Sequence, residues 1–169
     1  MSEKKRCVIV GGADIRAYDF VRSYLRADDF VIYCDSGLKH REGLGAAPDL
    51  IVGDFDSHEN PHLPVETIVL PRAKDDTDSV FAVKEALRRG FEEFLLLGAM
   101  GARLDHTLAN VGILLMLDAA NKRAMAVDDY SEMRIVSREP AHVQDDCPYF
   151  SLLNVSGLAR GVTIRGAKF

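Results

Sequence analysis

Residues 48–57 read PDLIVGDFDS, a short apolar run that is followed by a glycine and two carboxylates. The run at 50–52 predicts a strand buried on both faces, which Gly53 ends. In an extended segment, residues two apart point to the same side, so Asp54 and Asp56 would face one cation together. Magnesium prefers such hard oxygen ligands. The stretch therefore predicts a strand that ends at a metal site, with a solvated turn as the alternative.

Similar apolar runs recur along the chain, at residues 7–10, 30–33, 67–70, 94–97 and 124–127. Helical spacing appears between some of them: after a cap at Asp14, from about 78 to 89 with Gly90 as C-cap, and from about 105 to 120. Strand–helix alternation is typical of parallel sheets with right-handed crossovers. The sequence therefore predicts an α/β fold, with a Rossmann-like parallel sheet in residues 1–128.

Polar and glycine residues stand at the ends of these strands, in Gly11-Gly12, at residues 35–37 (DSG), at Gly53-Asp54 and at residues 98–105. Ligands of parallel sheets bind beyond the carboxyl ends of the strands, so these separate motifs would converge on one rim. Gly12 could cradle a phosphate there, although a tight turn explains it equally well.

Residues 74–78, KDDTD, directly precede the expected helix at 78–89. Thr77 or Asp78 would cap that helix, and its free N–H groups favour an anion. Lys74 could hold a phosphate, and Asp78 could supply another metal ligand. A charged loop with a good N-cap is the alternative.

Residues 98–106, GAMGARLDH, form a glycine-rich loop before the expected helix at 105–120. Glycines let backbone amides approach a phosphate, and Arg103 could bind phosphate oxygens in a bidentate way. Asp105 could cap the helix or contact a ribose or base. Asn110 lies about a turn after His106, so both are expected to face one cleft. A flexible loop with a cap is the alternative, and His106 alone is more typical of a hydrogen-bonding residue. The other four histidines are expected at the surface: His40, His58, His62 and His142.

The pattern changes from about residue 129, where helical periodicity fades. Strands are expected at 132–136, 149–155 and 161–165, in a second, antiparallel region that spans 129–169. An isolated β region of this size struggles to close a core, so we expect further residues beyond 169.

The composition excludes several classes of protein. The 169 residues are 47% hydrophobic and 28% charged, as in soluble globular proteins, and the net charge is −5. The sequence has no basic run of the kind that indicates nucleic-acid binding, and no apolar stretch approaches the length of a membrane span. Three widely spaced cysteines fit neither a zinc site nor a disulfide framework, and they favour a cytoplasmic location.

Four ordered blocks together resemble the thiamine pyrophosphokinase family: residues 34–37, 48–57, 74–78, and 98–106 with Asn110. The resemblance covers the whole α/β region and continues weakly beyond it. It implies an α/β catalytic domain followed by a β-sandwich domain, here incomplete, in a homodimer. It also implies an enzyme that transfers diphosphate from ATP to thiamine with Mg²⁺, giving AMP and thiamine diphosphate.

The resemblance also implies roles for single residues. Asp54, Asp56 and Asp78 are the expected metal ligands and catalytic carboxylates, and Asp75 or Asp35 is the expected acceptor of the thiamine hydroxyl proton. Ala102 stands where the family usually has a second glycine before the arginine. The expected ATP site comprises Gly12, Asp35, Ser36, Lys74, Thr77, Arg103, Asp105, His106 and Asn110.

Two other functions remain open at this point. A nucleotide-sugar transferase can also use an Asp-x-Asp metal site, but it would not account for residues 74–78 together with 103–106. A nucleotide- or thiamine-binding sensor would keep the fold and lose turnover. An ordinary P-loop kinase is disfavoured, because the chain has no lysine–serine P-loop motif.

Overall fold

The computed structural model describes residues 6–56, 60, 62–71, 76–101, 103–144, 147–155 and 157–168. The chain divides into two units, Met1–Ser137 and Arg138–Phe169. Among the described residues, no helix is both long and apolar enough to cross a membrane.

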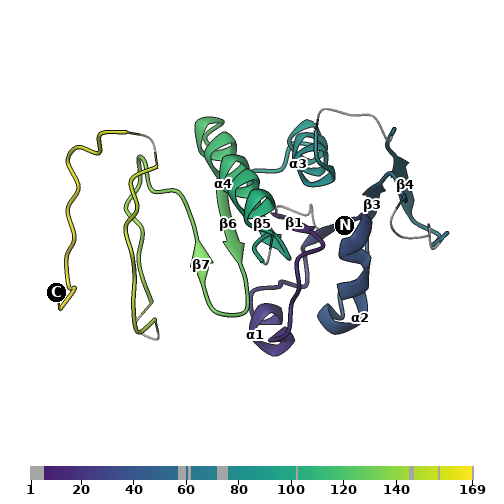
Figure 1. Cartoon of the computed structure of the whole chain (residues 1–169), viewed down its shortest axis with the longest axis horizontal. Coiled ribbons are helices and arrows are strands. Elements are labelled where there is room, and N and C mark those ends of the chain that lie inside the picture. Colours follow the sequence, from purple (N-terminus) through teal and green to yellow (C-terminus); the bar gives the residue numbers. More distant parts are fainter. Residues whose placement is uncertain are drawn as a thin grey trace. The chain divides into compact units, whose positions relative to one another are not determined.

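The first unit is built on a seven-stranded sheet with the order β4-β3-β2-β1-β5-β6-β7. All pairs are parallel except β6 with β7, which is antiparallel (Figure 1). The first six strands follow the predicted apolar runs to within a residue at each end, which confirms the expected α/β fold. The strands are β1 (Arg6–Val10), β2 (Phe30–Cys34), β3 (Leu50–Gly53), β4 (Glu66–Val69), β5 (Glu93–Leu97), β6 (Arg123–Val127) and β7 (Glu132–Met133).

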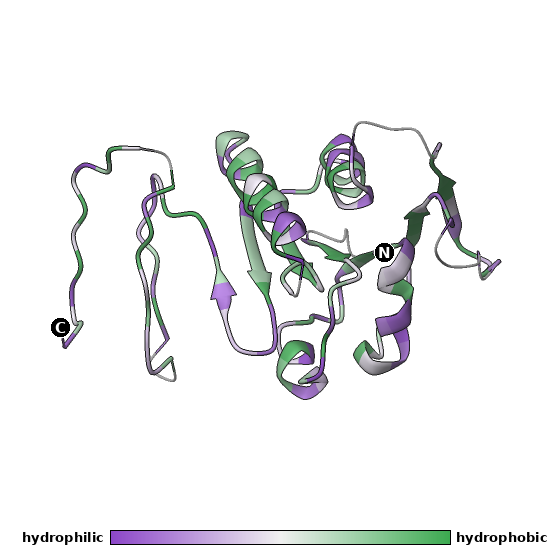
Figure 2. Ribbon diagram, viewed as in Figure 1, coloured by the Kyte–Doolittle hydropathy of each residue, from purple (hydrophilic) through white to green (hydrophobic). Residues whose placement is uncertain are grey.

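Helices cover both faces of this sheet (Figure 1). Helices α3 (Asp78–Arg88) and α4 (Leu104–Ala119) pack on one face, where Cys7 and Ile9 of β1 point. Helices α1 (Tyr18–Arg22) and α2 (Arg41–Leu44) and the 3-10 helix η1 (Asp35–His40) pack on the other, toward which Val8 and Val10 point. Because alternate residues serve opposite faces, the central strands must be apolar throughout. Figure 2 shows these hydrophobic strands between the helices.

Helices α3 and α4 lie where the periodicity predicts them. Thr77 is the N-cap of α3, and its Oγ1 accepts a hydrogen bond from the backbone N–H of Val80 at 3.3 Å. Gly90 follows the helix with a φ of 87°, a left-handed conformation that favours glycine. The short helices η1 and α2 were not predicted.

The first helix is much shorter than predicted: α1 begins at Tyr18, and Asp14 does not cap it. The carboxylate of Asp129, after β6, instead accepts backbone hydrogen bonds from Arg16 and Ala17 at 3.0 Å. Asp14 forms an ion pair with Lys39 at 2.8 Å. These contacts hold residues 13–17 as a loop at the carboxyl edge of the sheet.

The second unit differs from the expectation for residues 129–169. The predicted strand at 132–136 is reduced to β7, which joins the first sheet, and the first compact unit extends to Ser137. The described residues of the second unit form no strand, and the β-sandwich is not confirmed. Large apolar side chains such as Tyr149, Leu153 and Leu158 are exposed there. A sandwich needs a second sheet to cover such side chains, and the described part of this unit has none.

Candidate active site

A cleft opens at the carboxyl ends of the central strands, where the strand order reverses. The chain runs from β1 outward to β4 on one side and then returns to β5 on the other side of β1. Parallel sheets bind ligands at such a point. The cleft is lined by the loop after β1, the end of β2 and the first turns of α3 and α4, through Gly11, Gly12, Cys34, Ser36, Thr77, Asp78, Ser79, His106, Ala109 and Asn110.

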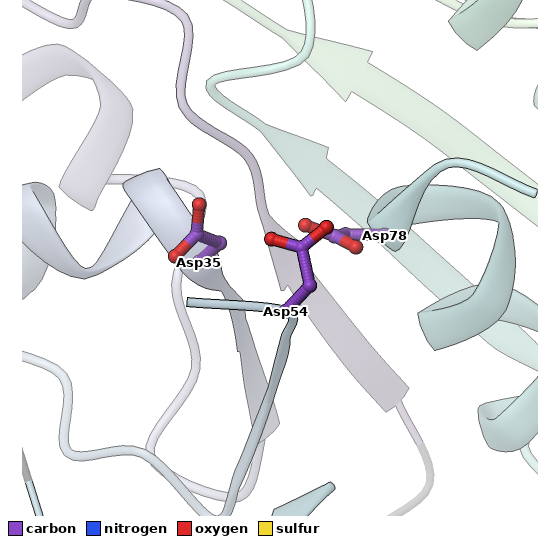
Figure 3. A group of neighbouring side chains, drawn as sticks. All are labelled: Asp35, Asp54 and Asp78. Carbon is purple, nitrogen blue, oxygen red and sulfur yellow. The ribbon is translucent and has the colours of Figure 1, made fainter. Parts of the chain in front are cut away.

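Three carboxylates meet at this rim: Asp35, Asp54 and Asp78 (Figure 3). One carboxylate oxygen from each lies within 4.8 Å of the others. Asp35 begins η1 after β2, Asp54 follows β3, and Asp78 is the first residue of α3. A Cβ on Gly53 would lie 2.9 Å from the Cβ of Asp35, so glycine allows the ends of β2 and β3 to approach closely.

This carboxylate group has the chemistry of a divalent-cation site. Three like charges at such a separation repel one another, and a bound cation would offset the repulsion. Asp35 is only 7% exposed, which strengthens the repulsion, because water screens buried charges less. Carboxylate oxygens are the ligands that Mg²⁺ and Ca²⁺ prefer. The three residues therefore fit the cation that the sequence implies.

Asp56 does not join this group, although the sequence pairs it with Asp54. Phe55 has a φ of 54°, and the backbone N–H of Asp56 donates to Oδ1 of Asp54 at 3.2 Å. The segment is therefore a turn in which the aspartate side chain bonds the backbone two residues on. The extended alternation assumed for residues 54–56 is wrong, and Asp56 is exposed. In the described residues, Asp35 completes the group.

Residues 74–78 are described only in part, because Lys74 and Asp75 lie outside the described residues. Thr77 and Asp78 both line the cleft. Ser79 also lines it, and the sequence analysis did not single it out. Its place in the first turn of α3, next to Asp78, is the signal that could have found it.

Arg103 and Asp105 contact each other and do not line the cleft. The guanidinium donates to Oδ2 of Asp105 at 2.7 Å, and the side chains are 68% and 65% exposed. The N-cap of α4 is Arg103, and it makes no side-chain capping bond, so Asp105 does not cap the helix. The hydrogen bond from Arg103 instead lowers the pKa of Asp105. Arg103 would have to exchange this partner to bind a phosphate.

His106 and Asn110 both line the cleft, as their helical spacing predicts. Gly12 and Ser36 also line it and lie against each other. A Cβ on Gly12 would lie 1.8 Å from Oγ of Ser36, so glycine is needed there for close approach.

His40 is buried, which corrects the expectation of a surface position. It is 2% exposed, and burial lowers its pKa. Its Nε2 lies 2.8 Å from the carbonyl of Ala13, and its Nδ1 lies 2.7 Å from the hydroxyl of Tyr18. Nε2 must carry the proton to donate to the carbonyl, and the tyrosine then donates to Nδ1. No pattern in the sequence signals this anchor for the loop after Gly12.

Comparisons with known proteins agree with this architecture. Residues 21–126 match the family model described as thiamin pyrophosphokinase, catalytic domain. All three carboxylates of the candidate metal site fall inside that match. The search of curated protein sequences found no relative.

Solved structures of similar fold include several thiamin pyrophosphokinases. That from Geobacillus thermodenitrificans is 29% identical with a TM-score of 0.59, and the match covers 73% of this chain and 59% of that one. That from Bacillus subtilis is 23% identical with a TM-score of 0.66, over 77% and 64% of the two chains. A probable thiamine pyrophosphokinase from Staphylococcus saprophyticus is 25% identical with a TM-score of 0.57, over 76% and 67%.

The chain thus spans about three fifths of the length of the first two structures. The match to the catalytic-domain model nevertheless extends over more than half of the chain and includes the cleft-lining residues from Cys34 to Asn110. The chain belongs to the thiamin pyrophosphokinase family.

Proposed function

We propose that this chain transfers diphosphate from ATP to thiamine, giving AMP and thiamine diphosphate, with Mg²⁺ as the cofactor. The observation that carries the proposal is the meeting of Asp35, Asp54 and Asp78 at the switch point of the sheet. A diphosphate is heavily anionic, so its transfer depends on positioning and on charge neutralisation. Three carboxylates repel such a group unless a cation lies between them, which favours a metal-dependent reaction.

Asp35, Asp54 and Asp78 would hold the cation. Bound Mg²⁺ would offset negative charge on the phosphate oxygens during the transfer. The role implied for Asp56 as a ligand stays a prediction, and the turn at Phe55 favours Asp35 in its place.

The protein groups around the cleft would orient the substrates. The amino end of α3, with Thr77 as its cap, places its positive dipole end at the cleft and favours an anion there. Ser36 and His106 would contact ATP from the cleft walls. Asn110 also lines the cleft, but its amide nitrogen is already bonded to the carbonyl of Ala99. Arg103 and Lys74 would offset further charge, Arg103 after release from Asp105.

The reaction joins the thiamine hydroxyl oxygen to the β-phosphorus of ATP and breaks the bond from that phosphorus to the oxygen that leaves with AMP. The hydroxyl proton must pass to a base. Since Asp35 belongs to the carboxylate group that faces the cation, we assign the proton to Asp75, which lies outside the described residues. A homodimer, which rests on the family resemblance, and a cytoplasmic location, which rests on the widely spaced cysteines, complete the proposal.

The test is AMP production from ATP and Mg²⁺, with and without thiamine. We expect AMP only when thiamine is present, in equal amount to thiamine diphosphate. ATP binding without AMP would instead support a nucleotide-binding sensor, and turnover of a nucleotide sugar would support a transferase. Either result would overturn the proposed activity.

A further inference from the structure

The loop that begins at Gly98 is in close contact with the loop after β1. The carbonyl of Gly98 accepts a hydrogen bond from the N–H of Ala13 at 2.9 Å. A Cβ on Gly98 would lie 2.3 Å from the carbonyl oxygen of Gly11, so no larger residue fits without movement. Ala99 and Met100 are both buried. The start of the loop is therefore fixed by the loop after β1.

Two side chains of α4 hold the rest of this loop. Nδ2 of Asn110 donates to the carbonyl of Ala99 at 2.6 Å, and Asn110 is 9% exposed. Oγ1 of Thr107 accepts from the N–H of Gly101 at 3.2 Å and donates to the carbonyl of Arg103 at 3.1 Å. Residues three apart lie on the same face of a helix, so both side chains reach the loop together.

These contacts use groups that would otherwise be available to a nucleotide. The N–H of Gly101 is bonded to Thr107, and the Asn110 amide nitrogen is bonded to Ala99. Each bond joins one residue of α4 to one residue of the loop before it. Thr107 also holds the carbonyl of Arg103, the residue with the exposed guanidinium.

We propose that Thr107 and Asn110 are positioning residues that hold residues 98–101 in place for ATP binding. They act through the loop and not by direct contact with the phosphates. The inference rests on the proposed function of the site. A glycine-containing loop loses conformational entropy when a ligand orders it, and a loop that is already ordered binds more tightly. Loss of either side chain therefore weakens ATP binding without touching thiamine.

The experiment is calorimetric titration of ATP, with excess Mg²⁺ and no thiamine, into the full chain and its variants. Thr107→Val removes the hydroxyl and keeps the shape, and Thr107→Ser restores the hydroxyl. Asn110→Leu removes the amide. Thr67→Val is the matched control, because the Thr67 hydroxyl contacts only the local carbonyl of Val65 among the described bonds. Thermal unfolding and the KM values for ATP and thiamine are measured in parallel.

We expect Thr107→Val and Asn110→Leu to weaken ATP binding about tenfold, the order of one lost hydrogen bond with its ordering effect. Thr107→Ser and Thr67→Val should bind ATP as the unchanged chain does, and the KM for thiamine should stay constant.

Unchanged ATP affinity in Thr107→Val and Asn110→Leu, or a fall in their melting temperature alone, would overturn the inference and leave the proposed activity standing. ATP binding by the unchanged chain without AMP formation would defeat only the activity. Absence of ATP binding by the unchanged chain would overturn both.

Discussion

At the amino end of the sheet a buried arginine meets a buried aspartate, whereas at the carboxyl end three aspartates meet one another. Arg6, at the start of β1, donates two hydrogen bonds of 2.7 Å to Asp29, just before β2, and both residues are 5% exposed. Asp35, Asp54 and Asp78 meet at the opposite end, within 4.8 Å. The Arg6–Asp29 pair stabilises the fold. The three aspartates repel one another, and this arrangement is favourable only when a cation binds between them. Removing a charge should therefore lower the free energy of unfolding at the amino end, and leave it unchanged or raise it at the carboxyl end.

The largest expected effect on stability is at the amino end. Arg6→Met should lower the free energy of unfolding by about 3–5 kcal/mol, because it leaves a buried charge on Asp29 without its arginine. Urea unfolding measures this. Arg26→Met is the matched control: Arg26 pairs with Glu93 but is 53% exposed, so its loss should cost less than about 1 kcal/mol. An equal loss of unfolding free energy in the two variants would contradict the stabilising role of the buried Arg6–Asp29 pair.

At the carboxyl end, Asp54→Asn should reduce AMP formation at least about 100-fold, the order seen when a transition-state charge loses its stabilisation. The same change removes one of three repelling charges, so unfolding without metal should require as much urea as before, or more. Both quantities are measured on one preparation. Loss of stability together with activity would show that the carboxylates hold the fold and not a ligand.

A smaller effect is expected for Asp56→Asn. Asp56 is exposed and lies outside the carboxylate group, so AMP formation should fall less than in Asp54→Asn. Steady-state rates at saturating ATP and Mg²⁺ give the comparison. An equal or larger loss in Asp56→Asn would restore the Asp-x-Asp ligand pair that the sequence suggests.

The smallest expected effect is a pH dependence from His40. Burial lowers the pKa of His40 in the folded chain, whereas the unfolded chain titrates near the ordinary value of about 6.5. Below that pH the unfolded chain binds more protons, so stability falls as the pH falls. Tyr18, Lys39, Asp14 and Asp129 surround the ring.

The measurement for His40 is urea unfolding at several pH values between 7 and 5. His40→Gln keeps a donor for the Ala13 carbonyl and should flatten the decline relative to the unchanged chain. His142→Gln, at an exposed position, should leave the decline as it is. If stability still falls as steeply with pH in His40→Gln, groups other than His40 cause the fall.

The strands and the two long helices could be predicted because their residues determine them locally. Central parallel strands are apolar on both faces, and α4 is a long apolar segment. Helix α3 combines helical spacing with the Thr77 cap and the terminal Gly90. The segment 13–17 could not be predicted, since its shape depends on the distant carboxylate of Asp129. The same holds for His40, whose partners lie 22 and 27 residues away.

The sequence singles out the three carboxylates of the candidate site, but not their grouping. Asp54 and Asp78 follow from position at a strand end and a helix start. Asp35 takes the place expected for Asp56 because Phe55 adopts a left-handed conformation, which a bulky residue rarely does. The pairing of Arg103 with Asp105 is likewise a property of the folded loop.

The central claim, that three strand-end carboxylates form a divalent-cation site, is tested most directly by Mn²⁺ binding without nucleotide. Electron paramagnetic resonance counts the free ion during a titration of the full chain. We expect saturable binding that weakens at least about tenfold in Asp35→Asn and in Asp54→Asn, because each loses one of three ligands. Asp19→Asn, at an exposed remote position, should bind as the unchanged chain does. Equal Mn²⁺ affinity in all four proteins would contradict the claim.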